Sequence, residues 1–182
     1  MSNKVTASNP KVGGAVYTAP VGTALPTSAG ATLNVAFNAL GYISEDGLTN
    51  ANAPDSEDIK AWGGDTVLTI QESKDDKFTF KLIEALDPNV LKAVYGTSNV
   101  TVDAHDNITV NVKNEALTPM SWVIDMILKG NIPKRIVIPS ASISDLGDIV
   151  YKSDDAVGYE ITITASVDAS GNTHYEYIGN NS

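Results

Sequence analysis

The sequence predicts a mostly β protein, in which antiparallel strands pack as a sandwich or flattened barrel with one short α-helix at about residues 88–95. Three observations lead to this prediction. Several segments alternate apolar and polar residues, which is the pattern of half-buried strands. Turns rich in Gly, Asn and Asp separate these segments. Only one stretch carries strong start and stop signals of a helix.

Length and composition fit one globular domain without covalent crosslinks. The chain has 182 residues, 42% hydrophobic and 19% charged, so it can bury a core of ordinary size. It contains no cysteine, which excludes disulfides, thiolate metal sites and cysteine nucleophiles and agrees with a reducing compartment. No stretch is apolar enough for a signal-peptide core or a membrane span, so we expect folding in a cytoplasm and no membrane partner.

Acidic residues outnumber basic ones. The chain has 12 Lys plus Arg against 22 Asp plus Glu, a net charge of −10, and its only arginine is Arg135. Tight nucleic-acid binders neutralise phosphates with clustered Lys and Arg. This composition therefore predicts a protein that repels DNA, although DNA can still pass close to it.

Residues 1–34 are predicted to form an N-terminal arm, followed by a single β-sandwich domain over residues 35–182. The arm is uncharged from Val12 onward, and it is too rich in Gly and Pro for a helix and too weakly patterned for a central strand. Between residues 13 and 31 its large apolar residues are Val16, Tyr17, Val21 and Leu25. Either the arm lies on its own domain, or it lies on a neighbouring subunit, where the absence of charge avoids a desolvation cost.

A long loop is predicted over residues 45–65, which are acidic and contain Gly, Asn and Pro. Loops of this length in a small domain are more often functional than idle. A strand over residues 66–71, a polar hairpin turn over 73–76 and a half-buried strand over 78–83 are expected to follow.

The helix prediction rests on both of its ends. Asp87 suits the N-cap and Pro88 the first helical position. Leu86 and Leu91 have the spacing of a hydrophobic staple. Gly96 suits the position just after the last turn.

The second half of the chain contains further strand patterns. They are expected over residues 108–113, 122–129, 135–143 and 160–167. Residues 168–172 read as a hairpin turn with glycine in the left-handed position. Tyr175 and Tyr177 are placed on the return strand.

Signatures of catalysis and metal binding are absent from the sequence. It has no phosphate-binding Gly-Lys-Ser/Thr, no Gly-x-Ser-x-Gly elbow and no His-Glu-x-x-His helix. Asp103, His105 and Asp106 imitate a metal site, but the calcium-loop pattern requires further acids and a glycine at set offsets, so a solvated turn is favoured. We therefore predict no enzyme, no catalytic residue, no cofactor and no metal site.

The two tryptophans have different expected roles. Trp122 is assigned to the core because Ile124, Met126 and Leu128 share its face. Trp62 anchors the predicted loop either to its own sheet or to a partner. A sugar-stacking platform formed by both is a weaker alternative.

The chain contains several short motifs in a characteristic order. They are Gly-Ala-Val-Tyr (14–17), Ala-Pro-Val-Gly-Thr (19–23), Leu-Pro-Thr (25–27), Leu-Gly-Tyr-Ile-Ser-Glu-Asp-Gly-Leu (40–48), Ile-Lys-Ala-Trp-Gly-Gly-Asp (59–65) and Phe-Thr-Phe-Lys-Leu-Ile-Glu (78–84). In this order they resemble the tail tube (major tail) proteins of long-tailed, non-contractile bacteriophages. The likeness covers most of residues 13–95 and, more loosely, the remainder.

The resemblance implies a structural role in the virion tail, with assembly in the host cytoplasm. Subunits of that family form rings, usually of six, whose sheets join edge to edge, and the rings stack into a hollow tube through which the genome leaves. The implied partners are other copies of the chain and the tape-measure, tail-terminator and tail-tip proteins, while DNA passes without specific binding. The family's long loop and arm reach neighbouring subunits, and here they correspond to residues 51–65 and the arm up to residue 31.

These regions supply the candidate inter-subunit contacts. They are Val16, Tyr17, Val21, Leu25, Asp55 and Trp62. Channel-lining acids are not assigned, although a negative channel is expected because a like-charged wall keeps DNA from adhering. If the arm lies on a neighbour, deleting residues 1–31 should leave a folded domain that no longer stacks.

Two alternatives belong to other functional classes. A secreted or surface carbohydrate-binding or adhesion β-sandwich would explain the strands, the tryptophans and the glycosylation-like triplets at Asn99 and Asn107, but it requires an export signal. A hydrolase would need two acids at a fixed separation in a cleft.

Overall fold

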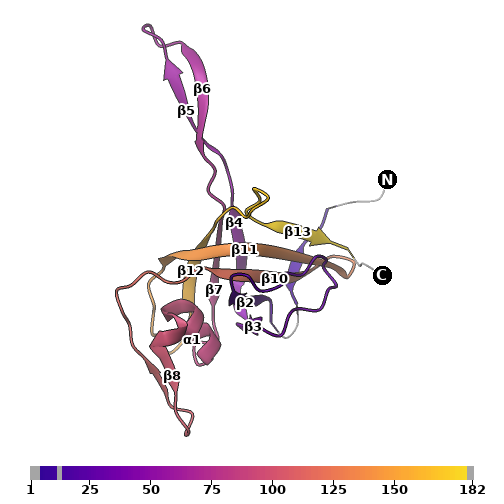
Figure 1. The fold of residues 1–182 in the computed structure, drawn as a ribbon, viewed down its shortest axis with the longest axis vertical. Helices are drawn as coiled ribbons and strands as arrows, with labels where there is room; N and C mark the ends of the chain where they lie inside the picture. The colour runs from indigo at the N-terminus through magenta and orange to yellow at the C-terminus, as the bar shows by residue number, and fades with distance from the viewer. Residues whose placement is uncertain (1–4, 12–13, 180–182) are drawn as a thin grey trace.

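The computed structural model describes residues 5–11 and 14–179. The fold is mostly β, with 45% of residues in strands and 7% in helix, and its strands pair antiparallel (Figure 1). In the described part of the chain the strands form no closed barrel. The predicted fold class is therefore confirmed in its sandwich-like form.

The main sheet contains nine strands. Seven of them follow the order β3-β2-β10-β11-β12-β7-β4, while β1 pairs with β10 and β13 pairs with β11. Their bounds are β1 (Ser8–Pro10), β2 (Val16–Pro20), β3 (Asn38–Ala39), β4 (Ile43–Ala51), β7 (Lys77–Leu82), β10 (Met120–Leu128), β11 (Ile132–Leu146), β12 (Tyr159–Ala165) and β13 (Tyr175–Ile178). Two separate two-stranded sheets consist of β5 (Asp55–Lys60) with β6 (Thr66–Ser73), and β8 (Val100–Val102) with β9 (Ile108–Val110).

The fifteen-residue strand β11 organises the main sheet because its partner changes along one edge. One edge pairs with β10 over residues 132–138 and, after a shift in register, at residue 141. The other edge pairs first with β13, over residues 134–137, and then with β12, over residues 141–146. As a result, β1 and β13 flank one end of the β10–β11 pair and form a four-stranded segment with it. The strands β2 and β12 flank the other end of the same pair.

The core lies between the curved sheet and the helix α1 (Pro88–Tyr95). Trp122 is 1% exposed and contacts Phe80 edge to face, with ring centroids 6.1 Å apart. Val90 and Val94 pack from α1 against this cluster. The core assignment of Trp122 is confirmed, and its burial removes it from any sugar-stacking platform with Trp62. In the described residues no helix is long and apolar enough to cross a membrane.

The helix has the predicted bounds and caps. Asp87 Oδ1 accepts a hydrogen bond of 2.7 Å from the Asn89 backbone N–H, and Gly96 follows the last turn with φ +94°. The predicted hydrophobic staple is wrong, because Leu86 is 86% exposed whereas Leu91 is buried. A turn closed by the Asp87 N–H and the Glu84 carbonyl directs the chain away from such a contact.

We expect Asp87→Ala to lower the free energy of unfolding by about 1 kcal/mol, because the helix loses the acceptor for one of its unpaired N–H groups. Urea unfolding monitored by circular dichroism measures this change. Asp87→Ser keeps a capping oxygen and should stay close to the original stability. Equal losses for both variants would contradict a capping role.

The predicted loop over residues 45–65 is wrong. Its first part is β4, which pairs with β7, and its second part is β5, which pairs with β6. Charged residues occupy both strands because much of their surface faces solvent, and this removes the apolar alternation on which strand prediction depends. Only residues 52–54 and 61–65 of this range lie outside strands.

Two predicted hairpin turns connect strands that do not pair with each other. Residues 73–76 link β6 to β7, but β7 pairs with β4 and β12. Residues 168–172 form the expected turn, with Gly171 at φ +81°, but the following β13 pairs with β11 rather than with β12. The sequence predicts where these turns lie, but which strands pair is decided by segments that are distant in the sequence.

The N-terminal arm is not separate from the domain. Its residues 16–20 form β2, which pairs with β10 and β3 inside the main sheet. Val16 and Ala19 are both 0% exposed. Deleting residues 1–31 would remove this strand from the main sheet, so the remaining chain is not expected to stay folded. Residues 1–4 and 12–13 of the predicted arm lie outside the described residues.

A buried carboxylate ties the segment before β13 to the sheet. Asp76 accepts hydrogen bonds from Asn50 Nδ2 (2.7 Å) and Thr173 Oγ1 (2.6 Å), and its Oδ2 also contacts His174 Nδ1. Burial raises the pKa of Asp76, but the hydrogen bonds from Thr173, Asn50 and His174 outweigh it and hold the pKa below the ordinary 3.8.

This lowered pKa predicts acid sensitivity. A depressed folded-state pKa contributes stability above the unfolded value of 3.8, and that contribution is lost as pH falls through the lower folded value. Asp76→Asn should cost about 1–3 kcal/mol at pH 7, since buried donors lose a charged acceptor. Thermal unfolding from pH 7 to pH 2.5 should show that the difference in melting temperature between Asp76→Asn and the original chain narrows below about pH 4. A constant difference across that range would refute the stabilising role of the Asp76 carboxylate.

Candidate assembly surface

The strands β5 and β6 form a hairpin that projects from the body of the molecule (Figure 1). It is inserted between β4 and β7, whose ends pair directly at Ala51 and Lys77. In the described residues its backbone pairing is internal, β5 with β6, and joins neither strand to the main sheet. The hairpin is thus an extension whose removal would leave the main sheet intact.

The two faces of this hairpin differ in polarity. Ile59 lies opposite Leu68, and Ile70 follows two positions later, so all three share one face. All three are exposed in the single chain. The other face carries Asp58, whose Oδ1 accepts a 2.6 Å hydrogen bond from Thr69 Oγ1, and the exposed Val67. On the first face Glu57 lies opposite Ile70. We call Ile59, Leu68 and Ile70 the apolar hairpin face.

The tip of the hairpin presents Trp62 to solvent. The Ala61 N–H donates to the Asp65 carbonyl (2.8 Å), and the Gly64 N–H donates to the Ala61 carbonyl (3.0 Å). Gly63 and Gly64 have φ of +134° and +97°, which glycine adopts without strain. Trp62 itself is fully exposed. It therefore does not anchor this segment to its own sheet, and contact with a partner stays a prediction.

The remaining candidate contacts differ in accessibility. Val16 is buried in the chain's own core and offers no surface to a neighbour. Tyr17 is partly buried, and its hydroxyl donates to the Gly14 carbonyl. Val21 is exposed and Leu25 is partly buried. Asp55 begins β5, but its side chain lies outside the described part of the structure.

A buried ion pair holds the segment after β2 against the sheet. Arg135 donates through Nε and Nη2 to the two carboxylate oxygens of Asp125, at 2.6 and 2.8 Å. Its Nη1 donates to the carbonyls of Ser28 (3.2 Å) and Ala31 (2.6 Å). Lys11 Nζ lies 3.4 Å from Asp125. Of the two interpretations of the arm, this stretch follows the first and lies on its own domain.

Several strand edges have no partner within the described chain. β1 and β13 each pair on one edge only, and β4 pairs only with β7. Unpaired edges display backbone N–H and C=O groups that readily pair with another chain. Together with the apolar hairpin face, these edges form the candidate assembly surface.

The turn that imitated a metal site is closed by its own hydrogen bonds. Asp103 Oδ1 accepts from the backbone N–H groups of His105 (2.8 Å) and Asn107 (2.9 Å), and Oδ2 accepts from Asn107 Nδ2. The side-chain hydrogen bond from Asn107, followed by the two backbone bonds, lowers the pKa of Asp103. No group of three or more potential metal ligands occurs among the described residues.

A sandwich with uncovered edges and a projecting amphipathic hairpin is typical of chains that associate with one another. The comparison with known families defines the class as a structural protein of a phage tail, because the family model described as phage tail tube protein matches residues 3–182. The chain therefore belongs to the phage tail tube protein family and is a virion component. A search of curated proteins finds no match to it.

Proposed function

We propose that copies of this chain form rings, with six subunits each, that stack into the hollow tube of a long, non-contractile tail, through which DNA is ejected. The observation that carries the proposal is the apolar hairpin face, Ile59, Leu68 and Ile70, which projects from the body without a partner. Burying such a face stabilises association by about 25 cal/mol per Å². The tape-measure, tail-terminator and tail-tip proteins are the further partners, and assembly takes place in the host cytoplasm.

The four-stranded segment β1-β10-β11-β13 supports closure of the ring. Its two outer strands, β1 and β13, each leave one edge unpaired in the described chain. If β13 of one copy pairs with β1 of the next, the sheet continues from subunit to subunit. Contacts between two different edges are heterologous, and such contacts close into a ring when the rotation permits.

The projecting hairpin supports stacking of rings. It extends along the longest axis of the molecule, and the hairpin that contains β8 lies at the other end (Figure 1). Contact between opposite ends of successive copies repeats without limit and yields an open-ended assembly. Val21, which directly follows β2, is exposed and available for further contacts.

The acidic composition supports passage of DNA without binding. With a net charge of −10, a channel wall that carries part of this charge repels the phosphate backbone. A reconstruction with a basic channel would argue against this role.

Electron microscopy of the purified chain at low and raised concentration tests the proposal. We expect rings or tubes with a central hole, and their length should increase with concentration. A compact monomer that persists at millimolar concentration would reject the proposal.

A further inference from the structure

The four-stranded segment β1-β10-β11-β13 has strand directions that suit repetition. Neighbouring strands run antiparallel at each of its three internal pairings. Because the number of strands is even, its two outer strands, β1 and β13, also run in opposite directions. When copies are arranged around a ring axis, β13 of one copy therefore meets β1 of the next in antiparallel orientation, and the alternation continues without a break.

The inner side of β1 defines which backbone groups point to its outer edge. The Lys129 N–H on the β10 side donates to the Ala7 carbonyl (3.0 Å). Successive residues of a strand direct their backbone groups to opposite sides, so Ser8 and Pro10 direct theirs to the outer edge. Proline has no N–H and is tolerated at such edge positions. The outer edge of β1 therefore offers the N–H and carbonyl of Ser8 and the carbonyl of Pro10.

The outer edge of β13 offers matching groups. The Gly179 N–H donates to the Pro133 carbonyl on the inner side (2.9 Å). By the same alternation, Tyr177 directs its backbone groups to β11, whereas Glu176 and Ile178 direct theirs outward. The edge of β13 thus presents an N–H and a carbonyl at each of two positions.

The side chains at all of these edge positions lie on one face of the segment. Residues directly opposite one another in a sheet share a face, and the register continues from Pro10 through Met126 and Lys134 to Ile178. The other edge position of each strand is two residues away and shares that face. A continuous sheet requires this agreement, because two residues that exchange hydrogen bonds must also share a face. With the opposite arrangement on one edge, the strands could pair only through a bulge.

We propose that β13 of one copy pairs with β1 of the next with Ile178 opposite Ser8 and Glu176 opposite Pro10. Ser8 and Ile178 then exchange two hydrogen bonds, and the Glu176 N–H donates to the Pro10 carbonyl, so all three groups on the edge of β1 are paired. A shift of two residues in either direction would move part of the pairing beyond the ends of β13. This inference rests on the proposed ring and names the residues that close it.

The same register brings exposed apolar side chains together. Ile178 is 60% exposed and Ile132 is 42% exposed, and both lie on the face described above. Leu128 lies between Ser8 on one side and Ile132 on the other. Because the side chain of Ser8 is small, Ile178 of the neighbouring copy can lie across it against Leu128. Burial of this apolar area adds to the backbone hydrogen bonds of the junction.

Disulfide crosslinking tests the register, since the chain contains no cysteine of its own. In the proposed register Asn9 lies opposite Tyr177 in a non-hydrogen-bonded pair, whose Cα atoms are about 4.5 Å apart, within the range that a disulfide spans. Within one copy β10 and β11 separate these positions by about 14 Å, so only different copies can be bridged. Oxidised assemblies of Asn9→Cys/Tyr177→Cys should give a ladder of covalent oligomers that a reductant removes.

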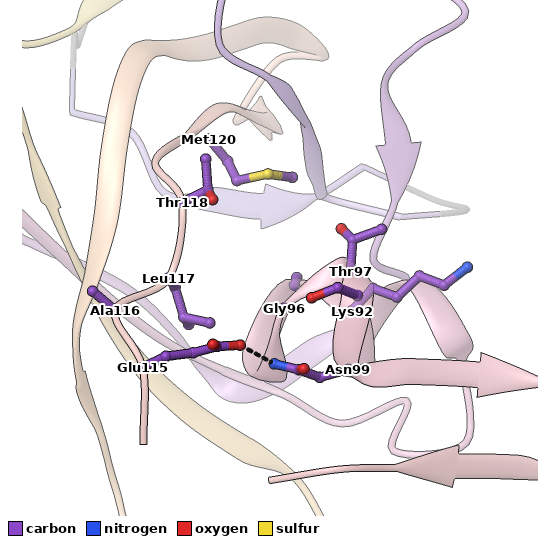
Figure 2. A pocket seen from close by; sticks show the side chains of 11 residues that line it. Lys92, Gly96, Thr97, Asn99, Glu115, Ala116, Leu117, Thr118 and Met120 are labelled. Carbon is purple, nitrogen blue, oxygen red and sulfur yellow. Dashed lines mark hydrogen bonds between the residues drawn. The ribbon is translucent and has the colours of Figure 1, made fainter. Parts of the chain in front are cut away.

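Two matched pairs control for the register and for chance contact. Asn9→Cys/Tyr175→Cys would crosslink only if β13 were shifted by two residues, because diagonal neighbours lie about 7–8 Å apart. Asn9→Cys/Thr97→Cys places the second thiol on the exposed rim of the cavity beside α1 rather than on a strand edge (Figure 2). Both controls should give no ladder.

The outcomes separate this inference from the proposed function. A ladder from the Tyr175 pair and not from the Tyr177 pair would overturn the proposed register. Rings or tubes that form without a ladder from either pair would also overturn the inference, because β1 and β13 would then not be joined, and would leave the proposed function intact. Failure of the original chain to form rings or tubes would reject both.

Substitution of Ile178 tests the apolar contact at a position that the single chain leaves exposed. Ile178→Asp should raise the critical concentration of assembly about tenfold, while the melting temperature of the unassembled chain stays the same. Val167→Asp is the control, because Val167 is 67% exposed and lies outside the four-stranded segment, and this variant should assemble like the original chain. Equal assembly of the two variants would contradict the burial of Ile178 between copies.

Discussion

Replacing residues 53–74 with an Asn-Gly dipeptide is expected to give a folded monomer that no longer forms tubes. The replaced segment contains all of β5 and β6, which pair only with each other in the described structure. Because Ala51 and Lys77 already pair, the new connection closes a short hairpin between β4 and β7. Asp76 and its hydrogen bonds remain in place. The main sheet should therefore keep its stability, while the apolar hairpin face is lost.

Sedimentation, electron microscopy and thermal unfolding measure this outcome together. A point variant gives a finer test: Leu68→Lys places a charge on the apolar hairpin face and should prevent stacking. Its matched control is Thr69→Lys on the opposite face, next to Asp58, which should still assemble. Tubes of normal length from the shortened chain would exclude the hairpin from stacking.

The sequence predicted those elements whose signals are local. Asp87, Pro88 and Gly96 determine both ends of α1, and the structure confirms them. The alternation of β7 and β12 is equally clear, since each strand has one buried face and one face that is mostly half-buried. In each case nearest neighbours along the chain provide the information.

Elements that depend on distant partners were missed. β2 was assigned to an arm because its sequence contains small residues and a proline, yet Ala19 packs without exposed surface in the main sheet. β4 and β5 were assigned to a loop because strands with much solvent contact carry charged residues. β13 was expected beside β12, whereas β11 is long enough to pair with both.

The candidate site was predicted unevenly for the same reason. Trp62 was identified because an aromatic residue between small residues and glycines stands out in the sequence. Asn99 belongs to a glycosylation-like triplet, but its side chain is buried and therefore inaccessible to that modification.

Arg135→Met is expected to lower the free energy of unfolding by about 3–5 kcal/mol, the cost of removing one partner of a buried ion pair. The substitution leaves Asp125, which is 4% exposed, with the half-exposed Lys11, 3.4 Å away, as its remaining cationic partner among the described residues. For a chain of this length the melting temperature should fall by roughly 10 °C. Thermal and urea unfolding measure both quantities. Arg135→Lys keeps the charge but not the paired geometry, so its stability should lie between that of the original chain and that of Arg135→Met.

The double variant Asp125→Leu/Arg135→Met separates the ion pair from the attachment of the arm. Removing both charges abolishes the unpaired carboxylate, so stability should recover most of the loss. The carbonyls of Ser28 and Ala31 still lose their tie to the sheet, because both of these bonds come from Arg135 Nη1. Limited proteolysis should therefore cut within residues 21–37 faster in the single and the double variant alike. If the double variant regained both stability and protease resistance, Arg135 would stabilise the fold without holding residues 21–37. The hydrogen bonds from Nη1 to the two carbonyls would then contribute nothing measurable to the order of this segment.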